Sequence, residues 1–452
     1  MSIESKMLKC IAFPLNDMVR GTNSVSYSRT LEETQWLSPS QIKKLQEKKL
    51  HALIEHAYKN VPYYKRMLDS FKLKPDDVKS IDDLSKLPLL TKEIIRENSK
   101  YITSQIHNKN KIKFLSGGTT GEPLISYKDK GAISCGMAAA YRGWSWGNYT
   151  IGDRYAMLWR SPETSAAFNN YSKRFVNIVR RNLFLYAFDL SDETLYNHIV
   201  QLRKFEPKII RISPSGGYAL AELMKRENIN DICPTSILST AEKLYDFQRK
   251  AIESQFGCKI FDSYGSNEIR SIAFECEEHN GYHISAENLI VEFIKDDENV
   301  ADNELGEIVI TDLTNYAMPF IRYKIGDVGS PSNETCSCGR GLPLMKSVEG
   351  RISDLIVTPK NRLLKSSYFV DLFNKFDFVK QFQVMQETSD RLKVKVVCKA
   401  EVTEEKLERL AEHLQTNTDN MTITIKCVDT IPPAKSGKLQ LTISNIKIRP
   451  QG

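Results

Sequence analysis

Three glycines and three hydroxyl side chains stand together in the stretch Leu115–Pro123 (LSGGTTGEP), between two short strand-like runs at 111–115 and 124–127. Glycine permits positive φ and close approach of the main chain to a ligand, while Ser116, Thr119 and Thr120 add hydroxyl donors to backbone N–H groups. Such a stretch can wrap a phosphate. It is not a Walker P-loop, because Glu122 follows the last glycine where that motif has Lys. By itself it could equally be a plain hairpin loop.

A second stretch places an aromatic side chain, a glycine and a carboxylate directly after a predicted strand. The residues are Asp262–Glu268 (DSYGSNE), and the strand before them ends at Phe261. Ligands of α/β sheets bind at this position, beyond the carboxyl ends of strands. Tyr264 can stack on a purine, and Glu268 can bind Mg²⁺, which takes one or two carboxylates together with substrate phosphates. The alternative is a turn that binds nothing.

Three later stretches set charged residues beside glycine. Ile321–Asp327 (IRYKIGD) delivers Asp327 after a strand-like run, where its carboxylate could accept both hydroxyls of a ribose or simply form an Asp-Gly turn. Val348–Asp354 (VEGRISD) falls at a predicted domain joint, and Pro432–Lys438 (PPAKSGK) lies near the C-terminus. Lysines in such loops are most often solvated, so the last stretch carries little weight alone.

Three cysteines and one histidine supply the ligand types of a zinc site. Six residues separate Cys276 from His283, and Cys336 and Cys338 form a C-x-C pair. Four Cys and His ligands leave no open position for water, so such a site would be structural. His279 is the rival imidazole, and reduced cysteines in a β-rich layer are the alternative. The cysteines without partner spacing are expected to be core residues: Cys10, Cys135, Cys233, Cys258, Cys398 and Cys427.

The elements that must position these stretches alternate between strand and helix from residue 131 to 264. Apolar runs predict strands at 154–159, 208–212, 236–240 and 259–264, and helical periodicity predicts helices at 131–146, 190–205, 217–227 and 242–256. This alternation predicts a largely parallel sheet covered on both faces. Before it, 38–60 is predicted as a helix capped by Ser40 and ended by Pro62, and 79–98 as helix in two pieces broken at Pro88. Ser191 is expected to cap the helix at 190–205.

The pattern changes twice further along the chain. From Asn288 it becomes strands separated by turns, clearest at 289–294 and 307–313, which predicts a second, β-rich layer. Beyond Gly350, strands at 382–386 and 393–398 pair across a polar turn, and a helix at 404–414 and a strand at 422–428 follow. We therefore predict a large domain at 1–349 and a small α+β domain at 350–452.

Composition describes an ordinary globular protein, with 41% hydrophobic and 26% charged residues among 452. The net charge of +7 is spread along the chain, which suits a small polyanionic ligand and argues against a nucleic-acid partner. Pro14 interrupts the short apolar stretch near the N-terminus, so no signal peptide is predicted. No run approaches 18 apolar residues, so no membrane insertion is expected. Nine cysteines without a secretion signal favour a cytoplasmic protein.

The five stretches in this order, from about Ser116 to Lys438, resemble the adenylate-forming superfamily of acyl-coenzyme A synthetases, peptide-synthetase adenylation domains and luciferases. The branch that the chain looks most like is the phenylacetate-coenzyme A ligase family with its capsular-polysaccharide relatives. Asn60–Tyr64 (NVPYY), Arg142–Trp146 (RGWSW) before Gly152, and the cysteine pattern carry that likeness. The resemblance implies the α/β adenylate-forming fold: mostly parallel sheets plus a β-rich layer in a large N-terminal domain, and a small mobile α+β C-terminal domain.

The resemblance also implies a role for each stretch. Magnesium would bind to Glu268, the ribose to Asp327, and Lys438 would reach the forming acyl phosphate. Arg351 would contact the nucleotide near a hinge at Gly350. The residues implied in ATP binding are Ser116, Gly117, Gly118, Thr119, Thr120 and Gly121 at the phosphates, Tyr264 and Gly265 beside the adenine, and Asn267.

The implied reaction is ATP-dependent activation of a carboxylic acid through an acyl-adenylate, with transfer of the acyl group to coenzyme A. Its cofactors would be ATP, Mg²⁺ and coenzyme A, with Zn²⁺ as a structural ion, and a homodimer is compatible with the family. One alternative passes the acyl group to a sugar-nucleotide amine or a carrier protein. Another is a non-catalytic nucleotide-binding protein. The acid itself is not predicted, and the candidates for its pocket are Tyr141, Trp144, Trp159, Ser213 and Ser215.

Several residues depart from the family pattern. Family members often have Lys after the loop's proline, where this chain has Leu124, and Thr before the glutamate, where it has Asn267. Ser353 stands where many relatives carry the hinge aspartate, with Asp354 next to it, and a usual glycine is replaced around 360–361. These departures are compatible with adenylation and put the thiolation conformation in doubt.

Overall fold

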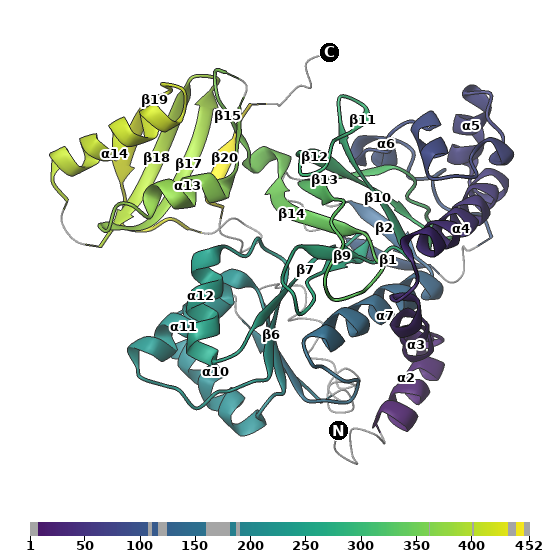
Figure 1. Ribbon diagram of the computed structural model, residues 1–452, viewed down its shortest axis with the longest axis horizontal. Helices are drawn as coiled ribbons and strands as arrows, with labels where there is room; N and C mark the ends of the chain where they lie inside the picture. Colours follow the sequence, from purple (N-terminus) through teal and green to yellow (C-terminus); the bar gives the residue numbers. More distant parts are fainter. Residues whose placement is uncertain are drawn as a thin grey trace. The chain divides into compact units, whose positions relative to one another are not determined.

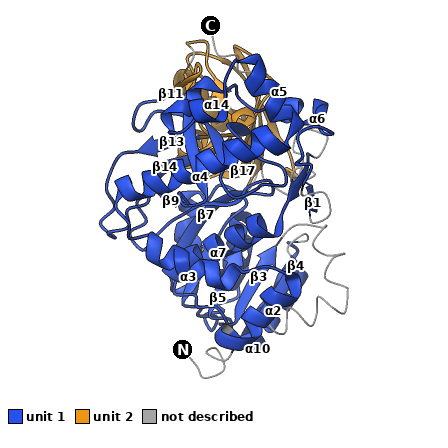
Figure 2. Ribbon diagram, turned by 90° about the vertical axis from the view of Figure 1, so that its right-hand side faces the viewer, with its two compact units in different colours: residues 1–294, 299–325, 329–348 blue, residues 295–298, 326–328, 349–452 orange. Residues whose placement is uncertain are grey.

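The computed structural model describes residues 8–106, 111–115, 124–159, 181–186, 190–360, 362–399, 402–432 and 440–446 (Figure 1). The chain divides into two compact units (Figure 2). Unit 1 comprises Met1–Ile294, Asn299–Ile325 and Gly329–Val348; unit 2 comprises Lys295–Glu298, Gly326–Val328 and Glu349–Gly452. Unit 2 thus includes two short segments that the predicted division at residue 350 gives to the N-terminal domain.

Unit 1 begins with helices. Ser38 caps the longest of them, α4 (Pro39–Asn60): its hydroxyl accepts from the N–H of Gln41, whose side chain accepts from the N–H of Ser38. The prediction of Ser40 as the cap was wrong, because Pro39 fits the first helical position. The other elements here are η1 (Leu8–Ala12), α2 (Phe13–Arg20), α3 (Ser24–Thr34), α5 (Pro62–Ser70), η2 (Pro75–Asp77), η3 (Asp82–Lys86) and α6 (Lys92–Glu97).

Replacing Ser38 with alanine is expected to lower the free energy of unfolding by about 1 kcal/mol, because an orphan N–H of α4 loses its acceptor. Urea denaturation followed by tryptophan fluorescence measures this loss. Ser40→Ala is the matched control, since the Ser40 hydroxyl contacts the Ser38 hydroxyl at 3.1 Å and no cap N–H. Equal losses in both variants would contradict the capping assignment.

A mixed sheet runs through unit 1 in the spatial order β10-β12-β13-β14-β9-β8-β7-β6-β5-β3-β4. The segment β4-β3-β5-β6-β7 is parallel, as predicted, and α10 to α12 connect its strands. Ser191 caps α10, also as predicted. The bounds are β3 (Tyr155–Trp159), β4 (Asn182–Tyr186), α10 (Asp192–Phe205), β5 (Ile209–Ile212), α11 (Pro214–Arg226), β6 (Ser236–Ser239), α12 (Asp246–Phe256) and β7 (Ile260–Ser266).

Side chains alternate between the two faces of this parallel segment. Ile210 and Ile212 of β5 pack into the cluster that includes α10, α11 and α12, which lie together beside the strands in Figure 1. Ile209 of the same strand packs instead with Trp144 of α7 (Lys130–Trp146). The parallel sheet is therefore covered on both faces, and α7 covers the face that concerns the candidate site.

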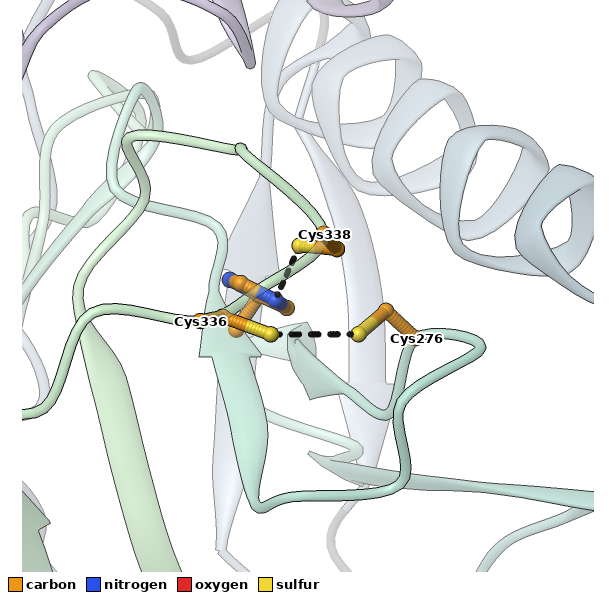
Figure 3. A group of neighbouring side chains, drawn as sticks. Cys276, Cys336 and Cys338 are labelled. Carbon is orange, nitrogen blue, oxygen red and sulfur yellow. Dashed lines mark hydrogen bonds between the residues drawn. The ribbon is translucent and has the colours of Figure 1, made fainter.

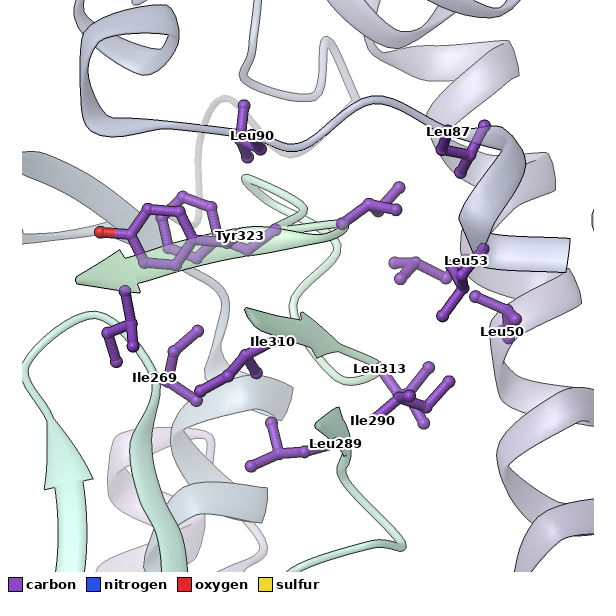
Figure 4. Packing of buried hydrophobic residues seen from close by; sticks show 14 of the residues in the cluster. Leu50, Leu53, Leu87, Leu90, Ile269, Leu289, Ile290, Ile310, Leu313 and Tyr323 are labelled. Atoms are coloured by element: carbon purple, nitrogen blue, oxygen red, sulfur yellow. The ribbon is translucent and has the colours of Figure 1, made fainter. Parts of the chain in front are cut away.

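Beyond β7 the sheet becomes antiparallel, which matches the predicted β-rich layer but starts earlier, at β8. Helix α4 packs on this layer, with Leu50 and Leu53 in the same cluster as Ile290 and Leu313 (Figure 4). The strands are β8 (Arg270–Phe274), β9 (Tyr282–Ile284), β10 (Leu289–Lys295), β11 (Glu298–Asn299), β12 (Gly306–Asp312), β13 (Tyr323–Ser332) and β14 (Leu344–Arg351).

A separate hairpin carries the predicted phosphate loop. Strands β1 (Ile112–Leu115) and β2 (Ile125–Lys128) are antiparallel, and Leu115 lies opposite Ile125 at the open end of the pair. The loop 116–123 joins these two residues and lies outside the described part of the chain. The strands on either side of it are as predicted.

Unit 2 contains an α+β arrangement, as predicted for the C-terminal domain. Its sheet has the order β19-β18-β17-β20, antiparallel between β17 and β18 and parallel at the two outer pairs. Neither unit has, among the described helices, one long and apolar enough to cross a membrane. The elements are η4 (Ile352–Asp354), β15 (Ile356–Val357), β16 (Leu363–Leu364), α13 (Ser366–Phe373), β17 (Val379–Thr388), β18 (Arg391–Cys398), α14 (Glu404–Asn417), β19 (Thr422–Cys427) and β20 (Thr442–Ser444).

Candidate functional site

The turn between β7 and β8 holds the predicted magnesium ligand. Glu268 lies in this turn and is 4% exposed, so its carboxylate is inside the fold rather than on a solvated loop. Gly265 is required by the backbone, because a Cβ at this position would lie 2.1 Å from the carbonyl oxygen of Arg270. Arg270 itself has φ +77°, and the register shifts between Tyr264 and Gly265. Strained backbone of this kind is typical of ligand sites.

The β7–β8 turn contacts strand β1, which leads into the predicted phosphate loop. The Asn267 amide donates to the carbonyl oxygen of Leu115 at 3.3 Å, and Leu115 is the last described residue before the loop. The Arg270 guanidinium lies 5.7 Å from the ring of Phe114 in the same strand. Two stretches that are 152 positions apart in sequence therefore meet. The loop residues Ser116, Gly117, Gly118, Thr119, Thr120 and Gly121 lie outside the described residues, as does Lys438.

A buried lysine that the sequence analysis missed lies beside these groups. Lys128, the last residue of β2, is 1% exposed, and its Nζ lies 5.1 Å from the Phe114 ring centroid. Burial, and then the like charge of Arg270, lower its pKa to about 7, although Asp312 and Glu268 oppose this shift. A cation at the end of the strand that leaves a glycine-rich loop was the signal available in the sequence.

Lys128 predicts a pH dependence of stability in the ligand-free protein. In the unfolded chain this amine has its ordinary pKa of 10.5, so between about pH 7 and 10 the unfolded state binds a proton that the folded state has lost. The free energy of unfolding should therefore rise with pH through Lys128 in this window. Urea denaturation at several pH values should show a flatter rise for Lys128→Met than for the unmodified chain, and parallel curves would refute the assignment.

Two other predicted nucleotide contacts lie together in unit 2. The Nε of Arg351 donates to Oδ1 of Asp327 at 3.1 Å in an ion pair. Gly326 and Gly350, which precede them, have φ +87° and +96°, a region that favours glycine. Asp354 accepts from the N–H of Arg351 at 3.2 Å. The glycines thus shape the backbone around a carboxylate and a guanidinium, and the binding of ribose by Asp327 stays a prediction.

The candidates for the acid pocket fall on the α7 face and at strand ends. The rings of Tyr141 and Trp144 in α7 are 5.7 Å apart, and Trp159 is the last residue of β3. Ser213 precedes α11, and the N–H of Ser215 donates to Glu242 at 3.1 Å.

The sequence analysis missed a strained residue at the same edge of the sheet. Ala241, two positions after β6 ends, has φ +78°, which is rare for a residue with a side chain. It lies between Thr240 and Glu242, beyond the carboxyl end of a parallel strand. The sequence signal was a small residue followed by a carboxylate directly after a predicted strand.

Cys276, His283, Cys336 and Cys338 come together in unit 1, from the segments that follow β8 and precede β14 (Figure 3). Their ligand atoms all lie within 4.8 Å of one another. The Cys276 and Cys336 sulfurs are 3.7 Å apart, too far for a disulfide, and Cys338 Sγ lies 3.3 Å from Nε2 of His283. Tetrahedral zinc would set S···S at about 3.8 Å and S···N at about 3.6 Å. The four side chains therefore fit such an ion.

The surroundings of the cluster suit a metal ligand at His283 and not at His279. Burial lowers the pKa of His283 to about 4, so its imidazole is neutral. Its Nδ1 lies 3.4 Å from the carbonyl oxygen of Leu342, which can orient the ring for binding through Nε2. His279 instead contacts Glu275 at 3.2 Å through Nδ1. The rival imidazole is thus engaged elsewhere.

Comparison with known proteins finds relatives over most of the chain. Residues 356–445 match the family described as CapK C-terminal domain. The chain is 25% identical to phenylacetate-coenzyme A ligase of Thermus thermophilus over 72% of this chain and 74% of the other, and 28% identical to that of Aromatoleum evansii over 72% and 74%. Protein CapK of Staphylococcus aureus is 24% identical over 89% of each chain.

Solved structures also resemble the chain. A 2-hydroxyisobutyryl-CoA ligase in the postadenylation state, in complex with 2-HIB-AMP, superposes with a TM-score of 0.73 over 90% of each chain at 17% identity. The O-succinylbenzoate coenzyme A synthetase of Bacillus subtilis, in complex with AMP, gives a TM-score of 0.52 over 73% of this chain and 67% of the other, also at 17% identity.

Proposed function

We propose that this chain, which has the adenylate-forming fold and is a distant relative of the phenylacetate-coenzyme A ligases, activates a carboxylic acid with ATP and passes the acyl group to coenzyme A. The observation that carries the proposal is the meeting of two stretches at Leu115 and Asn267. It brings the β7–β8 turn, which carries the buried Glu268 side chain, to the residue that precedes the glycine-rich loop in the sequence. A metal-binding carboxylate next to a loop rich in N–H donors is what a triphosphate requires.

The chemistry needs charge neutralisation rather than acid or base catalysis. The substrate carboxylate is already ionised, and it must approach the α-phosphorus of ATP, which is also anionic. Magnesium bound through Glu268, the N–H groups of 116–121 and the ammonium of Lys438 would offset this charge in the transition state. Asp327, with Arg351 beside it, would hold the ribose.

We further propose that Cys276, His283, Cys336 and Cys338 bind a structural zinc ion. All four positions of a tetrahedral ion would be taken by protein ligands, which leaves none for substrate or water. When bound, zinc would supply a cross-link between the segment after β8 and the segment before β14. No step of the reaction passes through it.

Pyrophosphate release tests the adenylation step. The purified protein is incubated with ATP, Mg²⁺ and each acid of a panel, and coenzyme A is then added while the products are analysed by mass spectrometry. Release with at least one acid followed by an acyl thioester supports the proposal. Release without a thioester would assign the acyl group to another acceptor, such as the amine of a sugar nucleotide or a carrier protein. Binding of ATP without release from any acid would favour a non-catalytic protein.

A further inference from the structure

Arg211 of β5 is a cation in an unusual place. It is the penultimate residue of a strand whose other members, Ile209, Ile210 and Ile212, are completely buried, yet Arg211 itself keeps partial exposure. Because side chains alternate along a strand, Arg211 points to the α7 face, opposite Ile210 and Ile212. Its position near the carboxyl end of a parallel strand is where ligands of such sheets bind.

The guanidinium of Arg211 is surrounded by aromatic rings. Its Cζ lies 4.4 Å from the ring centroid of Trp144 and 6.0 Å from that of Trp159. The Trp144 ring in turn packs against two tyrosines, with centroid distances of 5.7 Å to Tyr155 and 5.5 Å to Tyr149. These rings supply apolar contact and a weak cation–π attraction, but they accept few of the five N–H donors of a guanidinium.

No carboxylate within the described ranges forms an ion pair with Arg211, and no acceptor there takes a hydrogen bond from it. The charged side chain that acts most on the pKa of Arg211 is Arg270, which has the same sign. Burial first, and Arg270 in addition, lower the pKa of Arg211 to about 10, while Tyr155 and Tyr149 oppose the shift. A guanidinium enclosed in this way is costly unless an anion reaches it.

Arg270 connects this group to the candidate reaction site. It is two positions after Glu268, and its guanidinium lies 5.7 Å from the Phe114 ring in the strand that enters the phosphate loop. It is also near enough to Arg211 to change its pKa. Arg211 therefore lies within the electrostatic reach of Arg270, and it contacts Trp144 and Trp159, two of the residues predicted to line the acid pocket.

We propose that the acid activated by this chain is a dicarboxylic acid, whose second carboxylate binds to Arg211 between Trp144 and Trp159. This inference rests on the proposed function. The planar guanidinium fork matches a carboxylate with two parallel hydrogen bonds, a geometry that lysine cannot reproduce. The indole rings contact the carbon skeleton between the two carboxylates, so an aryl or a short alkyl spacer fits.

Matched pairs of acids test the proposal: phenylacetate against 4-carboxyphenylacetate, butyrate against succinate, and hexanoate against adipate. We expect kcat/KM for pyrophosphate release to be higher with at least one diacid than with its partner. Arg211→Gln should lower that value on the order of 30-fold for the diacid, since a charge-assisted pair is lost, and change it less than about threefold for the monoacid. For the diacid, the kcat/KM of Arg211→Lys should lie between that of the unmodified chain and that of Arg211→Gln. Arg154→Gln is the control, because Arg154 is exposed and pairs with Glu206 at 3.4 Å.

Thermal unfolding with each acid and Mg-ATP gives a second readout that needs no turnover. If monoacids are the better substrates, or if Arg211→Gln weakens both members of a pair equally, the inference is wrong and the proposed function stands. If no acid releases pyrophosphate but a diacid raises the Tm of the unmodified chain and not that of Arg211→Gln, the assignment of Arg211 as a carboxylate-binding residue stands and the proposed function fails. If neither release nor diacid-dependent stabilisation occurs, both are overturned.

Discussion

Glu268→Gln is expected to slow pyrophosphate release on the order of 100-fold, about 3 kcal/mol of transition-state stabilisation, with little change in thermal stability. The side chain keeps its size, so its packing in the β7–β8 turn is retained, but the amide cannot supply the negative charge that a Mg²⁺ ion needs. The concentration of Mg²⁺ required for half-maximal rate should rise at the same time. Initial rates measured over a range of Mg²⁺ concentrations give both values.

Two further variants separate metal binding from a general effect on the turn. Glu268→Asp keeps the charge and should retain more activity than Glu268→Gln. Asn267→Ala removes the 3.3 Å hydrogen bond to Leu115. It should therefore lower the free energy of unfolding by about 1 kcal/mol and leave the Mg²⁺ requirement unchanged. If Glu268→Gln lost activity with an unaltered Mg²⁺ requirement, the carboxylate would not be the metal ligand.

The fold could be predicted where local periodicity and tertiary burial agree. The parallel segment from β3 to β7 is an example, since its strands are short apolar runs between amphipathic helices. Helix α5 could not be predicted from the same cues. Pro62 was interpreted as the end of a helix, but proline also suits the first position of a new one, and a bend at Val61 separates the two. Strand β8 was not predicted, because the residues before it were interpreted as a turn and no strand was assigned after that turn.

Some residues of the candidate site could be predicted from the sequence and others could not. Residues with distinctive chemistry next to glycine, such as Glu268 and Asp327, could be proposed from the sequence because their types and spacing limit the alternatives, and their roles stay predictions. Lys128 and Arg211 were not found, because a single cation in a strand looks like any solvated surface residue. Only the three-dimensional packing shows that Lys128 is buried and that Arg211 lies against the Trp144 ring of α7. The burial of a charged side chain depends on segments that are distant in sequence, so it cannot be predicted from the neighbouring residues.

The choice between His279 and His283 could not be made from spacing either, because both follow Cys276 within seven positions. The register of the sheet decides it. His283 lies in β9 opposite Leu344 of β14, which brings it to the C-x-C segment that precedes β14. His279 lies in the preceding turn with φ +51° and faces Glu275. A prediction of which imidazole binds zinc therefore depends on a strand pair that the sequence analysis did not identify.

Cys336→Ser is expected to remove zinc from the protein and to lower its Tm by at least about 5 °C. Metal-bound and metal-free chains differ in stability by the binding free energy, and loss of a metal ligand is one of the few single substitutions with a large effect. The zinc content, measured by mass spectrometry after dialysis against a metal-free buffer, should fall from about one equivalent per chain to less than half an equivalent. A strong chelator should lower the Tm of the unmodified chain toward that of the variant.

Cys233→Ser is the matched control, because Cys233 is exposed, so its prediction as a core residue was wrong, and it lies outside the cluster. It should keep zinc and Tm unchanged. Cys336→Ser should also keep measurable adenylation below its own Tm, since the ion holds segments of unit 1 together and touches no reacting group. A protein that carries less than half an equivalent of zinc before any substitution would contradict the assignment, and the short Cys276–Cys336 contact would then be a pair of reduced thiols in the core. If activity disappeared on zinc removal while the fold persisted, the ion would have a role beyond the structural one.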